Sequence, residues 1–511
     1  MSSFDTAVKD NEKGNALGVQ VSDIDGAEHV ELYDSSLEWT EHEEKTLVNL
    51  LDLSLLPYIG LLIFVNQLDR ANISNAITNT FFADTGSGVN EVSYSTMVYQ
   101  VGFIVSEIPS SIIMRRVGAH IWLPTLAVGW GVVSLLQTWF LTSVSSLYAF
   151  RFFVGIFEGG FIPGTAFLLT RFYKKRETAG RLSVFWATQA LTTGVGGIIA
   201  FGTFSNLSGH DGLAGWRWFI LIEAVLTIGV ALGAFIYLRE SPSKWWALTK
   251  RQQQIAANRI VRDDPSKAYP FRAEITREEI VSALTDVNIY FYGILAFFSA
   301  IPINSFGGFL PYSIANFGFG GLTANLLSLP PYVALFFSLL LFSYSSDRTS
   351  SRALHSFTAV VVFAIGLILV EILQYTSPNK YALYFSSIVA VAGFTSWHAI
   401  NAAWVTENTT GQGRRTVALA VYIIFTNLAA FVSGWIYRSD DAPSFKRGNG
   451  INIAATLVAA SLYLVQRYRL IQINKQRAKQ WDLLTDIEKE VYAKEHPAGS
   501  DDRRLNFVYN Y

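Results

Sequence analysis

Long apolar runs that are nearly free of charge follow one another along most of this chain. One of them, "LLPYIGLLIFV" at 55–65, contains no charged residue. A helix needs about 20 mostly apolar residues to cross a bilayer. Hydrophobic residues make up 51% of the chain and charged residues only 15%, whereas soluble globular chains carry about 25% charged residues. These runs predict an all-α membrane protein and exclude a soluble multidomain chain.

The runs predict twelve transmembrane helices, arranged as two six-helix bundles. The expected spans are 52–72, 93–113, 121–141, 145–170, 179–203, 216–238, 286–311, 323–344, 353–374, 380–403, 414–436 and 449–467. The predicted domains are a disordered acidic tail (1–46), an N-terminal bundle (47–238), a central loop with short amphipathic helices (239–285), a C-terminal bundle (286–468) and a second tail (469–511).

Basic residues gather in one set of alternate loops. This set holds Arg115 and Arg116, the loop at 171–181, Arg348 with Arg352, and Arg414 with Arg415. The other set is nearly bare of Lys and Arg, except for the last loop at 438–447. Cytoplasmic loops carry the excess of Lys and Arg. The first set, the central loop and both termini are therefore predicted to be cytoplasmic.

A few charged or titratable side chains lie within the spans. They are Asp69, Arg70, Glu107, Arg151, Glu158, Glu223, Glu371 and His398. Such groups cost at least a few kcal/mol at the bilayer centre, about 2.5–3.5 on insertion scales, unless they are paired or hydrated. Each is therefore a candidate for function.

Arg151 and Glu158 lie on one span, seven residues apart. Two helical turns place them on the same side, about 10 Å apart along the axis, so they cannot pair directly. The nearest partners in the sequence are Asp69 and Arg70. The four groups together can bind an anion through arginine and a proton through a carboxylate. A static interhelical ion-pair network is the alternative, and the pattern leaves both open.

The remaining polar groups are expected to have mainly structural roles. Glu107 is expected to make a structural or gating contact with a basic loop, Glu223 an interior polar contact, and His398 a packing hydrogen bond. Gln189, Asn304 and Asn427 either line a hydrophilic path or join helices by hydrogen bonds.

Several classes of function are excluded by what the sequence lacks. There is no Cys for thiolate chemistry and no GxxxxGK[ST] phosphate loop. No channel-like filter is present. The net charge of −1 gives no reason to expect nucleic acid. We expect no enzymatic activity, cofactor or metal, and transport driven by a gradient.

A family resemblance rests on stretches spread from about residue 50 to the end. They include "NQLDRANISNA", "SEIPSSIIMRRVG", "RFFVGIFEGGFIPG", "GLAGWRWFILIE", "SSDRTSSR" and "DAPSFKRGNGIN". In this order they resemble the major facilitator superfamily. More specifically they resemble the anion:cation symporter family in its fungal allantoate-permease branch.

The resemblance implies roles for six residues. Asp69 and Glu158 match the protonatable groups, and Arg70 matches the arginine that meets the anionic substrate. Arg151 is implied to pair with the carboxylates. Gln189 and Asn427 match residues of the substrate-binding cavity.

Two motifs depart from the family. Phe103 replaces a Tyr that many relatives carry, and Ser111 replaces an Asn, so a hydroxyl that could contact substrate is missing; Tyr99 or Gln100 could substitute for it. The gating-loop motif of the superfamily is present only in the second half, where it holds Asp347 and Arg348. The first half keeps Arg115 and Arg116 but lacks the Asp, whose charge Glu107 could supply.

These features predict a proton-coupled symporter that carries a small organic anion by alternating access. A carboxylate or vitamin-like compound such as nicotinate, pantothenate or allantoate fits this branch. The expected location is the plasma membrane, with the lipid bilayer, protons and the anion as partners. An exporter of a small metabolite or drug, and a non-transporting nutrient sensor, remain alternatives.

Overall fold

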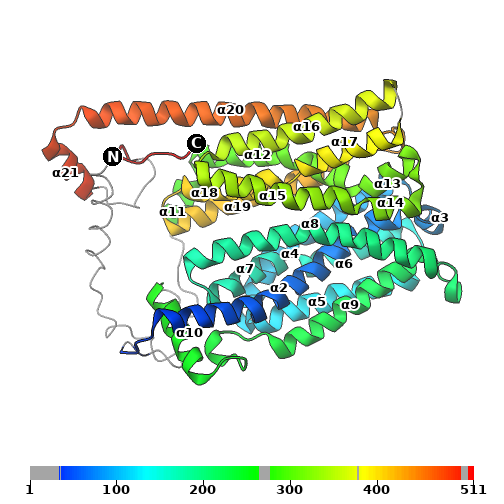
Figure 1. The fold of residues 1–511 in the computed structure, drawn as a ribbon, viewed down its shortest axis with the longest axis horizontal. Coiled ribbons are helices and arrows are strands. Elements are labelled where there is room, and N and C mark those ends of the chain that lie inside the picture. The colour runs from blue at the N-terminus through cyan, green and yellow to red at the C-terminus, as the bar shows by residue number, and fades with distance from the viewer. Residues whose placement is uncertain (1–33, 35, 264–276, 377–378, 496–503) are drawn as a thin grey trace.

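The computed structural model describes residues 34, 36–263, 277–376, 379–495 and 504–511, apart from the side chains at 115, 175–176, 178–180, 182–187, 412 and 493–495. Two bundles of long helices lie side by side (Figure 1). In the described part of the chain every regular element is a helix. Eleven helices there are long and apolar enough to cross a membrane. The predicted fold class is confirmed.

In its described residues, the N-terminal bundle consists of seven longer helices and one short one. They are α2 (Glu41–Ala76), α4 (Val89–Val117), α5 (Ala119–Phe140), α6 (Val144–Glu158), α7 (Phe161–Phe172), α8 (Lys175–Asn206) and α9 (Gly215–Tyr237), with the short α3 (Phe81–Thr85) between α2 and α4. The 32-residue α8 covers the fifth predicted span and is long enough to cross a bilayer as well.

The C-terminal bundle contains more breaks. It is built from α12 (Val287–Pro302), the π-helical turn η6 (Ile303–Gly307), α13 (Leu310–Ile314), α14 (Gly321–Leu327), α15 (Leu329–Thr349), α16 (Arg352–Thr376), α17 (Lys380–Ala392), α18 (Ser396–Glu407), α19 (Gln412–Ser433) and α20 (Lys446–Asp482). Such breaks are tolerated at membrane depth where they are buried or line a cavity.

The fourth span breaks directly after Glu158. Gly160 has a φ of +85°, a left-handed conformation that costs glycine little, and α7 then starts at Phe161. Glycines also bring α6 close to α4, since a Cβ added at Gly155 would lie 2.2 Å from the Tyr99 carbonyl oxygen. The break and the close packing together fix where Glu158 points.

The first helix starts earlier than predicted. Thr40 and Glu43 form a reciprocal capping box, and α2 begins at Glu41. Residues 41–46 are therefore helical and do not belong to a disordered tail; residues 1–33 of that predicted tail lie outside the described residues. A capping box satisfies two backbone donors at the helix start, which explains the earlier beginning.

The central loop carries α10 (Lys250–Asp263) and α11 (Arg277–Leu284). The helix α10 docks onto the N-terminal bundle through Arg259, which is fully buried and donates to Glu177 Oε2 at 2.7 Å and to the Phe172 carbonyl at 3.2 Å. We name this end of the molecule the α10 end and the opposite end, which carries α3, α13 and α14, the α3 end (Figure 1).

The second predicted tail is largely ordered. The helix α20 continues to Asp482 and is followed by α21 (Asp486–Glu495). The last residues return to the C-terminal bundle, where the Asn510 carbonyl accepts hydrogen bonds from Trp404 Nε1 at 2.7 Å and from Asn408 Nδ2 at 2.8 Å.

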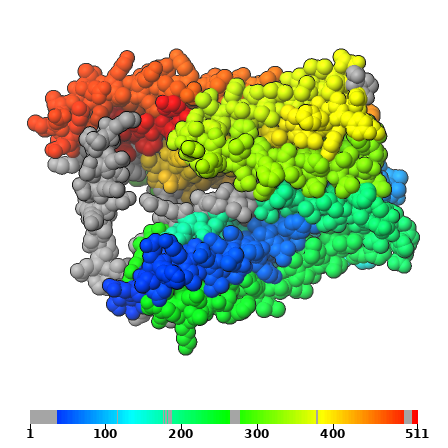
Figure 2. Space-filling view, in the orientation of Figure 1, coloured from blue at the N-terminus to red at the C-terminus, as the bar shows by residue number. Residues whose placement is uncertain are grey.

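The two bundles meet at the α3 end. Asn90 Nδ2 donates to Ser439 Oγ at 2.8 Å, and the Ser439 N–H donates back to Asn90 Oδ1 at 2.9 Å. Asn325 Nδ2 donates to Thr78 Oγ1 at 2.7 Å. Figure 2 shows the bundles touching at this end and separated toward the α10 end. The interface between the bundles is therefore closed on the α3 side.

Candidate functional site

A cavity of about 380 Å³ lies between the two bundles. Helices α2, α4, α6 and α8 line it from one side, and η6, α15, α18 and α19 line it from the other. Small-molecule sites are typically clefts of about 300–1,000 Å³. Both the position and the size suit a small ligand that contacts both bundles at once.

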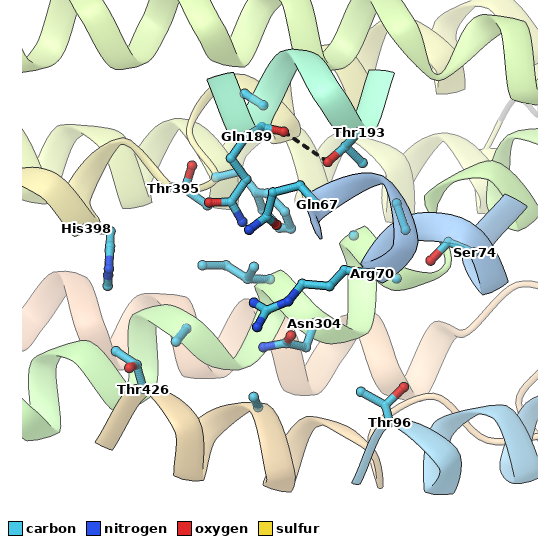
Figure 3. A pocket seen from close by; sticks show the side chains of 18 of the residues that line it. Gln67, Arg70, Ser74, Thr96, Gln189, Thr193, Asn304, Thr395, His398 and Thr426 are labelled. Carbon is cyan, nitrogen blue, oxygen red and sulfur yellow. Dashed lines mark hydrogen bonds between the residues drawn. The ribbon is translucent and has the colours of Figure 1, made fainter. Parts of the chain in front are cut away.

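Positive charge dominates the cavity wall. Arg70 and Arg151 line it, and among the described lining residues there is no Asp or Glu. Figure 3 shows Arg70 projecting from α2 into the cavity, with Gln67 and Gln189 on one side and Asn304 on the other. Arginine presents a planar fork of donors that fits carboxylate and phosphate groups. The wall is therefore suited to an anion.

The counter-ion of Arg70 is Glu158. Arg70 Nε donates to Glu158 Oε2 at 2.6 Å, and the Tyr99 hydroxyl donates to the same oxygen at 2.6 Å. The Arg70 side chain is 29% exposed, whereas that of Glu158 is completely buried. Glu158 therefore sits behind the wall and does not line the cavity. The prediction that Glu158 needs a partner from the first span is confirmed.

Arg151 is placed differently from what the resemblance implies. Within the described residues it makes no ion pair, and its buried Nε has no hydrogen-bond partner. Its Cζ lies 5.8 Å from the centre of the Tyr99 ring. The implied pairing with a carboxylate is absent from this conformation, because Arg70 occupies Glu158 and Asp69 points elsewhere.

Asp69 points into the N-terminal bundle. It accepts hydrogen bonds from Ser134 Oγ at 2.7 Å and from Asn72 Nδ2 at 3.1 Å, and it is 2% exposed. Successive residues on an α-helix point about 100° apart. Arg70 can therefore face the cavity while its neighbour Asp69 faces α5.

The predicted amide groups do line the cavity. Gln189 and Asn427 lie on opposite sides of it, and Gln100 Nε2 donates to Asn427 Oδ1 at 3.4 Å across the two bundles. The Phe103 ring, where the family more often has Tyr, lies 5.2 Å from Arg70 Cζ. Gln100 and Tyr99 both line the cavity, but the Tyr99 hydroxyl is already used by Glu158.

Sequence analysis did not identify the aromatic part of the wall. Phe309, Tyr332, Phe394 and Trp397 line the cavity from the C-terminal bundle. An aromatic residue in an apolar span is usually a packing residue, so the sequence carries no signal for this role. His398 also lines the cavity, and one of its ring nitrogens lies 2.9 Å from the Tyr422 hydroxyl.

At the α10 end the second-half loop motif forms an ion-pair cluster. Arg352, which is largely buried, pairs with Asp347 and with Glu407 Oε1, the latter at 2.5 Å. Arg348, which we predict to belong to the gating loop, is exposed and makes no ion pair within the described residues. Arg352, at the first turn of α16, supplies the cation of this cluster, and a gating role for Asp347 and Arg348 stays a prediction.

The first-half motif shows no matching cluster. Glu107 is partly buried on α4 and makes no ion pair among the described side chains, and Arg116 is exposed. The Arg115 side chain lies outside the description. A contact between Glu107 and this loop stays a prediction. Elsewhere among the described residues, no group of three or more His, Asp or Glu is placed to hold a metal.

Comparisons with known proteins agree with this geometry. A family model of the Major Facilitator Superfamily matches residues 59–434. The "Uncharacterized transporter YIL166C" of Saccharomyces cerevisiae is 28% identical over 489 residues, covering 93% of this chain and 88% of that protein. The "MFS-type transporter cnsO" of Penicillium expansum is 28% identical over 511 residues, covering 97% and 96%.

Solved structures share the fold. A crystal structure of a D-xylose-proton symporter matches with a TM-score of 0.63 at 16% identity, and the match covers 80% of this chain and 97% of that one. The family model spans more than half of the chain, and the relatives named above are transporters. This chain therefore belongs to the Major Facilitator Superfamily and is a multi-pass membrane transporter, not an enzyme.

Proposed function

We propose that this transporter is a proton-coupled symporter for a small organic anion. The observation that carries the proposal is the Arg70–Glu158 ion pair. Its cation reaches into the cavity, and its anion is buried behind the wall. A ligand in the cavity and a proton on Glu158 therefore act on the same guanidinium.

The coupling is electrostatic. When Glu158 takes up a proton, Arg70 loses its counter-charge in a poorly hydrated site, where an unpaired charge is costly. An anionic substrate then supplies the missing negative charge. After the substrate leaves, Glu158 releases its proton and the ion pair with Arg70 forms again. Tyr99 holds the shared Glu158 oxygen in place throughout, since its hydroxyl donates to that atom.

The cavity wall favours an anion with an apolar or ring-shaped body. Two arginines supply positive charge, the side-chain amides of Gln189 and Asn427 supply hydrogen bonds, and an aromatic wall on the other bundle supplies apolar surface. A small carboxylate or vitamin-like compound fits this chemistry. The structural neighbour described as a D-xylose-proton symporter supports proton coupling as a mechanism that this fold can run.

The closed α3 end supports transport by alternating access. Rocking of two rigid bundles around a fixed site at the midplane is the usual mechanism on this fold. With the loops of the α10 end in the cytoplasm, the structure corresponds to an inward-facing state. The plasma membrane is the proposed location.

Uptake of labelled small anions by yeast cells that express the protein tests the proposal. We expect one compound to accumulate more at acidic than at neutral external pH, and to lose this accumulation with a protonophore. The variant Glu158→Gln should lose the pH-driven accumulation but still exchange substrate. The matched control is Glu371→Gln, which changes a carboxyl in the other bundle that accepts a hydrogen bond from Asn449 at 2.7 Å. Protonophore-sensitive accumulation that persists in Glu158→Gln would refute the coupling role.

A further inference from the structure

A third carboxyl group is buried in the N-terminal bundle, outside the cavity. Glu223 on α9 is 1% exposed, and neither of its carboxyl oxygens has a hydrogen-bond partner among the described residues. It does not line the cavity. An ionised carboxylate in such a place has a high free energy unless a cation or several donors compensate it.

The helix register places Glu223 beside Asp69. At one end of the α5–α9 pair, Arg217 donates to the carbonyls of Thr138 and Leu141 at 2.6 and 3.0 Å. Further along, a Cβ added at Gly131 would lie 2.9 Å from Ile228 Cγ1. Residues between these two contact points face each other, so Glu223 lies level with Ser134.

Ser134 in turn donates to Asp69 at 2.7 Å, so the helix register brings Glu223 and Asp69 to the same level of the bundle. The two carboxyl groups therefore belong to one buried cluster.

Among the described side chains of the neighbouring helices, no cation pairs with Glu223. The helix α9 packs against α5, α2 and α8. Charged residues are absent from α5, and from α8 after Arg181; on α2 between 53 and 76 they are limited to Asp69 and Arg70. Arg181 pairs with Asp52, and Arg70 pairs with Glu158. The buried polar residues of α5 are Trp130, Ser134, Gln137 and Thr138, all uncharged.

The charges of the middle of the bundle also do not balance. Three carboxyl groups, those of Asp69, Glu158 and Glu223, accompany two guanidiniums, those of Arg70 and Arg151. One carboxyl is in excess, and the repulsion between two neighbouring carboxylates opposes the ionisation of both. Of the three, Glu223 has neither an ion pair nor a donor.

We propose that Glu223 is a further proton-binding site, and that it forms with Asp69 a coupled carboxyl pair that holds at least one proton apart from the substrate cavity. The pair titrates as a unit. The N-terminal bundle would then bind protons at two places, at Glu158 and at the Asp69–Glu223 pair. The proposal adds a site to the proton coupling proposed above, but the presence of a proton on Glu223 does not depend on which substrate is carried.

Infrared spectroscopy of the purified full-length protein tests this directly. At neutral pH we expect the C=O stretching band of a protonated carboxylic acid in the wild type, and loss of this band in Glu223→Gln. In Glu223→Asp the band should shift and persist. The control Glu371→Gln should keep the Glu223 band. A further readout is the melting temperature, which should stay close to the wild-type value in Glu223→Gln because no ion pair is removed.

A spectrum of Glu223→Gln at neutral pH that keeps every protonated-carboxyl band of the wild type would overturn the proposal. A large drop in melting temperature beside these unchanged bands would show that Glu223 is ionised and structurally paired. A different outcome is uptake that is insensitive to the protonophore while the wild type shows the band and Glu223→Gln loses it. In that case the transport proposal fails and the proton site stands.

Discussion

Removal of Arg70 should destabilise the N-terminal bundle more than removal of an exposed arginine. The substitution Arg70→Ala leaves the completely buried Glu158 with one hydrogen bond, from Tyr99, and no counter-ion. Breaking a fully buried ion pair costs about 3–5 kcal/mol. Since the Arg70 side chain is 29% exposed, water can replace part of the lost interaction. We therefore expect a loss of about 2–3 kcal/mol.

The assay is thermal unfolding of the purified protein in detergent. For a domain of this size, 1 kcal/mol shifts the melting temperature by about 2–4 °C, so the expected decrease in Tm for Arg70→Ala is about 4–12 °C. The control Arg116→Ala, at an exposed position of α4, should stay within about 0.5 kcal/mol of the wild type.

A double variant identifies the cause. In Arg70→Ala with Glu158→Gln, no charge remains stranded, so most of the lost stability should return and the two substitutions should show a coupling of about 2 kcal/mol. Equal melting temperatures for the single Arg70→Ala and the double variant at neutral pH would refute the reasoning.

Three further predictions concern other parts of the molecule. Arg352→Ala should lower the melting temperature and slow uptake because two carboxylates lose their cation, whereas Arg348→Ala should do neither; equal effects would contradict the assignment. Gly155→Ala should cost about 1–3 kcal/mol by overpacking α6 against α4, and an unchanged melting temperature would contradict this. Because the chain has no cysteine, the pair Asn90→Cys and Ser439→Cys should form a single disulfide that arrests transport until it is reduced; undiminished uptake by the oxidised protein would contradict closure of the α3 end.

The family of the chain could be recognised from its sequence because membrane insertion leaves a local signature. Apolar runs of spanning length and the order of short motifs are properties of contiguous residues. The helical fold class that they predict is confirmed. The same local logic found Asp69, Arg70, Arg151 and Glu158, since charge is rare enough within a span to stand out.

Boundaries and partners required the tertiary structure. The start of α2 at Glu41 depends on a capping box, a signal that the acidic composition of the tail conceals. The choice of Arg352 over Arg348 depends on which side chain can reach Glu407 from a neighbouring helix. These are contacts between residues that the sequence spacing alone does not bring together.

The sequence by itself determined which charges enter the membrane, because each charge is costly there and stands out in an apolar run. Only the tertiary structure decided what each charge does. Asp69 and Arg70 are adjacent in sequence, yet helix geometry turns one toward Ser134 inside the bundle and the other into the cavity. Glu223 gained its significance in the same way, since its lack of a partner among the described side chains becomes visible only when α5 and α9 are packed together.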